Sequence, residues 1–279
     1  MTTAPVGLAA LTVLDIDPIG QIEYAEKYGF DTVGLRLVPA TPTTAAYRLH
    51  EQPEQLKKVR ERLADSPVSV FDVEIIRLNE DYRGQDFGPF LEAAQALGAR
   101  AVLVSGDDTD ASRLVDSYAD FAQKCAEHGL AASLEPMPWT AVPNVKRALE
   151  VVGQADGPAR SILVDTLHTG RSTTTLEDLK SIPTEWIHYI QVCDAPVPTP
   201  EDMDEVIRQA REERLPAGDG GLDLAGMVAA LPAGTPLSVE LPNEPRRQRL
   251  GDDAWLPLLL EKTKAVEEAA NALRAEAAL

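Results

Sequence analysis

The amino-acid sequence predicts an α/β fold in which eight parallel strands, each followed by a helix, close into a single (β/α)8 barrel, the TIM barrel. Three observations support this prediction. A unit of helix, glycine and apolar strand recurs along the chain, and the strands are short continuous apolar runs, as expected of parallel strands buried on both faces. The 279 residues also match the size of eight such units. An open, doubly wound sheet is the alternative fold.

The repeated unit is an Ala-rich helix that ends in glycine just before a strand, as at residues 24–29, 93–98 and 125–129. Glycine suits this place because the residue after a helix commonly takes a left-handed backbone conformation. The successive junctions are Gly29, Pro67, Gly98 and Gly129, spaced by 38, 31 and 31 residues. This spacing indicates one strand and one helix per unit.

Eight strands are expected to begin near residues 7, 32, 68, 100, 131, 161, 187 and 236, and residues 1–279 are expected to form one barrel domain. An oversized insertion at about residues 195–221 separates the last two strands and contains a helix predicted from residue 201 to about 214. Such a loop at the C-terminal face of a barrel is a candidate lid or substrate clamp. The final helix, predicted for residues 252–278, carries an apolar stripe that would pack on the outside of the barrel.

The overall charge of the chain opposes two classes of partner. A formal net charge of −19 and a pI near 4.6 disfavour nucleic acid and anionic membranes, which need a basic face. Cys125 and Cys193 form no CxxC pair, so no disulfide framework is expected. The first residues lack the basic region of a signal peptide, and the cytoplasm is the expected compartment. The expected partner is a small polar molecule, and a homodimer is left open.

Four predicted strands each end in one oxygen-bearing side chain, namely Glu135, Asp165, Gln191 and Glu240. Each alone could simply cap the next helix. Their separations of 30, 26 and 49 residues place them on successive strands, so in a parallel barrel the four oxygens would converge at one rim. An all-oxygen set suits Mn²⁺ or Mg²⁺, with Co²⁺ or Zn²⁺ as alternatives. We therefore expect one divalent ion at this rim.

A divalent ion among such groups can stabilise an enediolate after a proton leaves the carbon next to a carbonyl. Glu135, Glu240 and His168 are the candidate catalytic groups for moving that proton, and His168 follows Asp165 on the same strand exit. Return of the proton to a neighbouring carbon would make the protein an isomerase. Return to the other face would make it an epimerase, and loss of a β-hydroxyl would make it a dehydratase.

Three arginines, Arg208, Arg211 and Arg214, lie at helical spacing in the insertion. They could form a solvated face that pairs with nearby glutamates. Alternatively, Arg211 or Arg214 could bind a substrate carboxylate or phosphate, for which a guanidinium is suited. Trp139, which follows Glu135 closely, is a third candidate substrate contact.

The stretches 135–139 (Glu-Pro-Met-Pro-Trp), 165–168 (Asp-Thr-Leu-His), 189–196 and 238–243 resemble the xylose isomerase-like TIM barrels that include sugar phosphate isomerases and epimerases. The resemblance implies that Glu135, Asp165, Gln191 and Glu240 hold a divalent ion. In that family histidine is usual at the third position. Glutamine there is similar to hydroxypyruvate isomerases and bacterial 3-dehydroshikimate dehydratases.

The resemblance leaves two reactions to weigh. The Asp-Ala-Pro stretch at 194–196, Arg211 with Arg214, and the glycines at 218 and 220 resemble the dehydratases. Ala217 and Gly221 stand where those enzymes usually have Pro and Glu, and residues 72–77 differ from their arginine-bearing stretch. The sequence therefore favours a metal-dependent isomerase or epimerase acting on a small keto-sugar, sugar phosphate or related hydroxy-carbonyl compound. A dehydratase is the alternative, and a non-catalytic sugar-binding barrel is a remote one.

Overall fold

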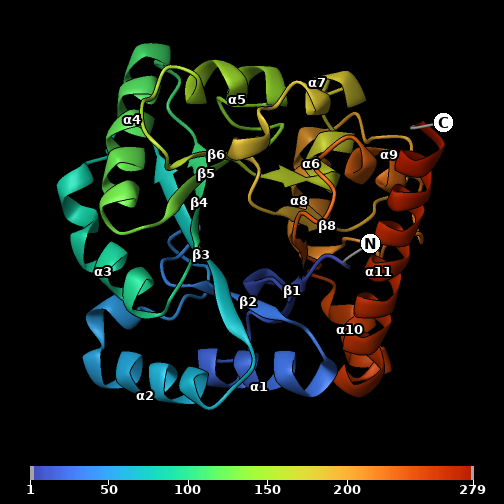
Figure 1. Cartoon of the computed structure of the whole chain (residues 1–279), viewed down its shortest axis with the longest axis horizontal. Helices are drawn as coiled ribbons and strands as arrows, with labels where there is room; N and C mark the ends of the chain where they lie inside the picture. Colours follow the sequence, from blue (N-terminus) through green and yellow to red (C-terminus); the bar gives the residue numbers. More distant parts are fainter. Residues whose placement is uncertain (1–2, 278–279) are drawn as a thin grey trace.

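A computed structural model describes residues 3–277 as a barrel of parallel strands surrounded by helices (Figure 1). The strand order is β6-β5-β4-β3-β2-β1-β9-β8-β7, and every pairing is parallel. The segments β6 and β7 are separated only by Leu163, so they form one interrupted strand. The (β/α)8 prediction is confirmed.

The strands are β1 (Val6–Leu8), β2 (Thr32–Arg36), β3 (Ser69–Leu78), β4 (Ala101–Gly106), β5 (Ala131–Glu135), β6 (Arg160–Ile162), β7 (Val164–Asp165), β8 (Ile190–Val192) and β9 (Leu237–Val239). Each predicted start lies within three residues of an observed strand start, if β6 and β7 are taken as one strand. The apolar runs predicted the strands well because their side chains are buried on both faces of the sheet.

The helices are α1 (Pro18–Tyr28), α2 (Pro53–Ala64), α3 (Gly88–Ala96), α4 (Ala111–Glu127), α5 (Val145–Val152), α6 (Thr166–Gly170), α7 (Leu176–Lys180), α8 (Met203–Glu212), α9 (Leu224–Ala229), α10 (Glu244–Leu250) and α11 (Asp252–Ala277). Gly29, Gly98 and Gly129 follow α1, α3 and α4 with φ of 84°, 72° and 70°. These values confirm the left-handed role expected of the repeated glycines. Among residues 3–277, no helix combines the length and apolarity needed to cross a membrane.

The barrel closes along a seam at the interrupted strand. Its first half, β6, pairs with β5, and its second half, β7, pairs with β8. Side-chain hydroxyls support the backbone of β6, and that of Tyr118 bridges β6 to its partner β5. The Ser161 amide donates to the Tyr118 hydroxyl at 3.1 Å, and the Ser161 hydroxyl donates to the Trp186 carbonyl at 3.0 Å. The Tyr118 hydroxyl in turn donates to the Ala132 carbonyl at 2.9 Å.

The long connection between β8 and α9 is organised by one buried carboxylate. Asp194 pairs with Leu215 in an antiparallel bridge. One oxygen of Asp194 accepts the amides of Ala195 and Leu222 at 2.8 and 3.1 Å, and the other accepts those of Gly218 and Gly220, both at 3.0 Å. The helix in this connection, α8, is two residues shorter at each end than predicted, and at its N-terminus Asp202 caps the helix. Asp194 thus fixes the segment that follows α8.

Candidate metal and substrate site

The four side chains predicted as metal ligands occupy strand exits. Glu135 ends β5, Asp165 ends β7, Gln191 lies in β8, and Glu240 directly follows β9. All four are at most 3% exposed. Because the strands are parallel and in register, with Asp165 opposite Gln191, their carboxyl ends meet at the same end of the barrel.

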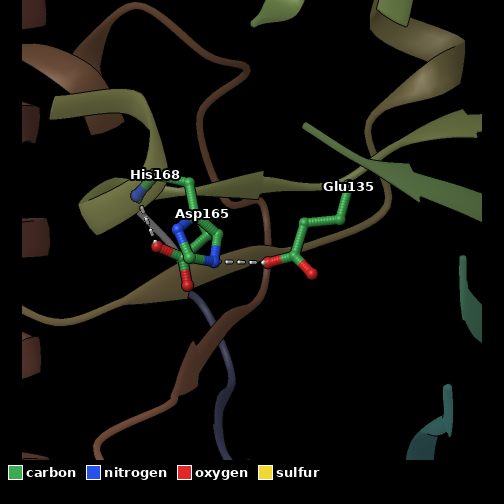
Figure 2. Close-up of side chains that lie close together, drawn as sticks. All are labelled: Glu135, Asp165 and His168. Carbon is green, nitrogen blue, oxygen red and sulfur yellow. Dashed lines mark hydrogen bonds and ion pairs between the residues drawn. The ribbon is translucent and has the colours of Figure 1, made fainter. Parts of the chain in front are cut away.

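Glu135, Asp165 and His168 lie together (Figure 2), with their potential ligand atoms all within 4.8 Å of one another. One oxygen of Asp165 caps α6 by accepting the amides of Leu167 and His168 at 2.7 and 3.1 Å. This cap places the His168 ring with its Nε2 3.5 Å from Glu135 Oε1. The ring of Trp139 meets the imidazole edge-on, with ring centres 4.9 Å apart.

Gln191 and Glu240 form a second part of the site. The Gln191 amide nitrogen donates to Glu240 Oε1 at 2.9 Å. The Oε1 atoms of Gln191 and Glu135 are buried and have no hydrogen-bond partner among the described residues. Buried oxygens without a partner are costly unless a further group satisfies them. These oxygens therefore fit a divalent cation, and glutamine can serve as a ligand and orient Glu240 at once.

Arg214 joins the two parts of the site. Its Nη1 lies 2.5 Å from Asp165 Oδ2, and its Nη2 lies 2.8 Å from Glu240 Oε2. The Nε atom donates to the Ala210 carbonyl at 2.7 Å, and the side chain is 3% exposed. The sequence suggested Arg214 as a contact for substrate, but in this structure its guanidinium binds two of the predicted metal ligands.

The buried charges of the site do not cancel. Glu135, Asp165 and Glu240 supply three carboxylates against the single guanidinium of Arg214. Burial raises the pKa of Glu135 well above its usual range and that of Glu240 to about 8, with neighbouring carboxylates adding to the effect. Burial also raises the pKa of Asp165, but Arg214 and His168 outweigh it, and the net pKa is lowered. A divalent cation would offset this excess of negative charge.

His168 is a neutral imidazole at neutral pH. Its pKa is lowered to about 4, mainly by burial; the charge of Asp165 opposes this shift and that of Arg214 adds to it. The Nδ1 atom is also buried and has no partner among the described residues. A neutral, correctly placed imidazole can accept a proton, so His168 has the chemistry of a general base.

A cavity of about 340 Å³ opens beside this cluster and exposes Glu135, His168, Glu240 and Arg214 to its interior. Trp139 and three threonines of the segment after β2 also line it: Thr41, Thr43 and Thr44. A neighbouring cavity of about 700 Å³ between α8 and α10 contains none of the predicted ligands. The smaller cavity is therefore the candidate substrate site.

Three further arginines line the candidate substrate site. Arg36 is buried and held by Glu74 at 2.8 Å, and Arg77 is held by Asp107 at 2.8 Å. Arg211, as predicted for a substrate contact, lines the cavity, and no described carboxylate lies within ion-pair distance of it. Arg208 instead pairs with glutamates on the exposed face of α8, which was the alternative expected for all three helix arginines.

Sequence reasoning missed Arg36 as a site residue and did not assign a role to Arg77. Arg36 ends β2, whose other residues are uncharged, whereas Arg77 lies near the end of β3, which also carries Asp72 and Glu74. Charged residues are rarely buried without a partner or a function, so Arg36 at the end of an uncharged strand was a usable signal. It was weaker than that of the ligand set because it did not recur from strand to strand.

Comparison with curated proteins shows similarity to two 3-dehydroshikimate dehydratases. The enzyme of Pseudomonas putida is 28% identical over 227 residues, which cover 74% of this chain and 35% of the relative. That of Pseudomonas aeruginosa is 30% identical over 204 residues, covering 67% and 32%. The chain spans about a third of the length of the curated relatives it matches.

Solved structures share the fold. The IolI protein, solved with a bound zinc atom, has a TM-score of 0.76 and 20% identity, over 94% of this chain and 98% of that one. The probable 3-DHS dehydratase AsbF from Bacillus anthracis has a TM-score of 0.73 and 15% identity, over 93% and 98%. Residues 22–275 of the sequence match the model of a protein family described as the xylose isomerase-like TIM barrel. Since this match spans most of the chain, the protein belongs to the xylose isomerase-like TIM barrel family.

Proposed function

We propose that the protein is a divalent-metal-dependent lyase that removes water from a cyclic β-hydroxy ketone bearing a carboxylate, with 3-dehydroshikimate as the candidate substrate. The observation that carries this proposal is the set of arginines around the small cavity, opposite a neutral imidazole and buried carboxylates. Once an ion offsets the excess carboxylate charge, the guanidinium of Arg211, which pairs with no described carboxylate, can bind an anionic substrate, and a neutral sugar would leave it unused. The names of the two curated relatives agree with this chemistry.

In this proposal Glu135, Asp165, Gln191 and Glu240 hold the ion. The excess buried negative charge and the unpartnered Gln191 and Glu135 oxygens support the assignment. When bound, Mn²⁺ or Mg²⁺ would supply positive charge for the oxygen on which negative charge develops. Zn²⁺ or Co²⁺ remain alternatives because His168 lies beside the same carboxylates.

His168 acts as the base in the proposed reaction. It removes a proton from the carbon next to the ketone, and the electron pair of the broken C–H bond forms an enolate. The enolate then expels the β-hydroxyl, which leaves as water after it takes the proton from the imidazolium. Tautomerisation, in which one proton moves from the ring CH2 group to the ketone oxygen, then gives the aromatic product. The imidazolium formed in the first step is thus the acid that protonates the departing hydroxyl.

This use of a single imidazole answers the main sequence argument against a dehydratase. The glutamate usual in the dehydratase loop is replaced by Gly221, and water loss requires an acid as well as a base. A residue that first accepts the proton and then returns it makes a second acid unnecessary. The proposal therefore reverses the order suggested by the sequence and places dehydration ahead of isomerisation or epimerisation.

The carboxylate of the substrate is proposed to bind Arg211 and Arg77. Arg77 is fixed by Asp107 and by the Ala40 carbonyl, and Arg211 has its guanidinium free for a ligand among the described residues. Trp139 would cover one face of the substrate beside His168. These contacts orient the ring without taking part in proton transfer.

The test is incubation of chelator-treated protein with 3-dehydroshikimate, with and without Mn²⁺. We expect metal-dependent formation of 3,4-dihydroxybenzoate with loss of one water, followed by ultraviolet absorbance and mass spectrometry. His168→Asn should abolish the product, whereas the matched His128→Asn, at the end of α4, should not. Parallel incubation of ketoses and their phosphates in D₂O would detect the competing reactions. Deuterium uptake into an otherwise unchanged ketose, without aromatic product from 3-dehydroshikimate, would make the protein an isomerase or epimerase.

A further inference from the structure

The Arg214 guanidinium bridges two predicted metal ligands, Asp165 and Glu240. Asp165 belongs to the cluster with Glu135 and His168, and Glu240 pairs with Gln191, so Arg214 links the two parts of the site. Asp165 Oδ1 is already used by two backbone amides, and Glu240 Oε1 is used by Gln191. Arg214 contacts the other oxygen of each carboxylate, Asp165 Oδ2 and Glu240 Oε2. A divalent ion held by both residues would therefore compete with Arg214 for these two carboxylates.

The backbone of Arg214 is held by hydrogen bonds, whereas its guanidinium borders a cavity into which it can rotate. The Arg214 amide donates to the Pro242 carbonyl at 3.2 Å, and Asn243 donates to the Arg214 carbonyl at 2.9 Å. The side chain itself borders the cavity of about 340 Å³. Rotation of the guanidinium into this cavity therefore requires no movement of the strand exits.

A guanidinium and a divalent ion repel each other when they share the same carboxylates, and the repulsion is strong at a dry site. The ion has the advantage because it can also bind the Glu135 and Gln191 oxygens, to which Arg214 makes no hydrogen bond or ion pair.

We propose that Arg214 is an exchangeable internal cation: it neutralises Asp165 and Glu240 in the metal-free protein, and metal entry moves its guanidinium away from them and into the substrate cavity. This inference rests on the metal site of the proposed function but not on the reaction catalysed there. Its consequence is that the free energy of metal binding includes the cost of breaking the two Arg214 ion pairs.

The test measures Mn²⁺ affinity by isothermal titration calorimetry for the wild type, Arg214→Met and Arg171→Met. Arg171 is the matched control because it is a buried arginine that contacts Gln209 and the Pro198 carbonyl but none of the predicted ligands. Arg214→Met should bind Mn²⁺ about ten-fold more tightly than the wild type, which corresponds to ~1.4 kcal/mol. Arg171→Met should match the wild type.

Arg214→Met also leaves two buried carboxylates without their cation, so its metal-free form should melt at a lower temperature and gain more from Mn²⁺ than the wild type does. If that variant does not fold, crystal structures of the wild type with and without Mn²⁺ decide the point. Loss of at least one Arg214 carboxylate contact on metal binding supports exchange. Persistence of both contacts beside a bound ion, or weaker Mn²⁺ binding by folded Arg214→Met, overturns it. A wild type that binds no Mn²⁺ overturns the metal site as well.

Discussion

Replacing Asp194 with asparagine tests whether one carboxylate holds the segment that carries Arg214. The carboxylate accepts four backbone amides, two on each oxygen, and an asparagine side chain keeps only one oxygen acceptor. Two amides lose their acceptor, and each such hydrogen bond to a charged group contributes about 1.5–3 kcal/mol. Because the loop amides are only partly buried and can recover water, we expect Asp194→Asn to lower the free energy of unfolding by about 3 kcal/mol.

The assay is urea unfolding followed by circular dichroism, together with hydrogen exchange of the amides of Gly218, Gly220 and Leu222. Asp219→Asn is the control, since Asp219 lies in the same loop but forms only partly exposed ion pairs, with Arg246 and Lys262. Such pairs contribute about 0–1 kcal/mol. Equal stability of the two variants, with unchanged exchange of the loop amides in Asp194→Asn, would refute the assignment of Asp194 as the organiser of this loop.

Three further outcomes are expected. Glu240→Gln should lower Mn²⁺ affinity by more than about ten-fold and reduce turnover with it, as measured by calorimetry and product formation; full activity after exhaustive chelation would contradict this. Burial depresses the folded-state pKa of His168 from 6.5 to about 4. The contribution of His168 to the free energy of unfolding is therefore complete above pH 6.5, and it is lost by about 1.4 kcal/mol per pH unit as the pH falls from 6.5 toward 4. Urea unfolding of metal-free protein at pH 7 and pH 5 should show a smaller loss for His168→Asn than for the wild type, and parallel losses would disprove the buried neutral state. Arg211→Ala should raise KM about ten-fold or more with little change in kcat, while Arg208→Ala should leave KM unchanged; equal KM values would remove Arg211 from the site.

The sequence predicted the barrel and the strand exits because both follow from local patterns. A buried parallel strand is an apolar run, and a carboxylate or amide that ends such a run stands out, as at Glu135 and Gln191. The position of Arg214 could not be predicted in this way. Its contacts with Asp165 and Glu240 join residues 49 and 26 positions apart and depend on the Asp194 loop and on a side-chain conformation.

The interior beside the site was also beyond prediction, because it depends on irregularities in strand pairing. The register of β2 with β3 shifts after Val33, and that of β3 with β4 shifts after Val73. These shifts bring Asp72 against Gly34, where a Cβ atom would lie only 2.7 Å from the Asp72 carboxylate. The alternation of side chains along β3 therefore cannot be extrapolated from either end, and the inward direction of Arg77 follows only from the three-dimensional pairing.

The link that Tyr118 makes between β5 and β6 means that the ring of strands is held together by side chains as well as by backbone. Tyr118, on a helix outside the barrel, supplies the hydroxyl that receives the Ser161 amide and donates to the Ala132 carbonyl. A phenylalanine at this position would fill the same volume and preserve every apolar contact, yet it would leave a strand amide without its acceptor a few residues before Asp165. The outer helical layer therefore does more than shield the strands from water, since one of its members forms part of the circumference on which the site is built.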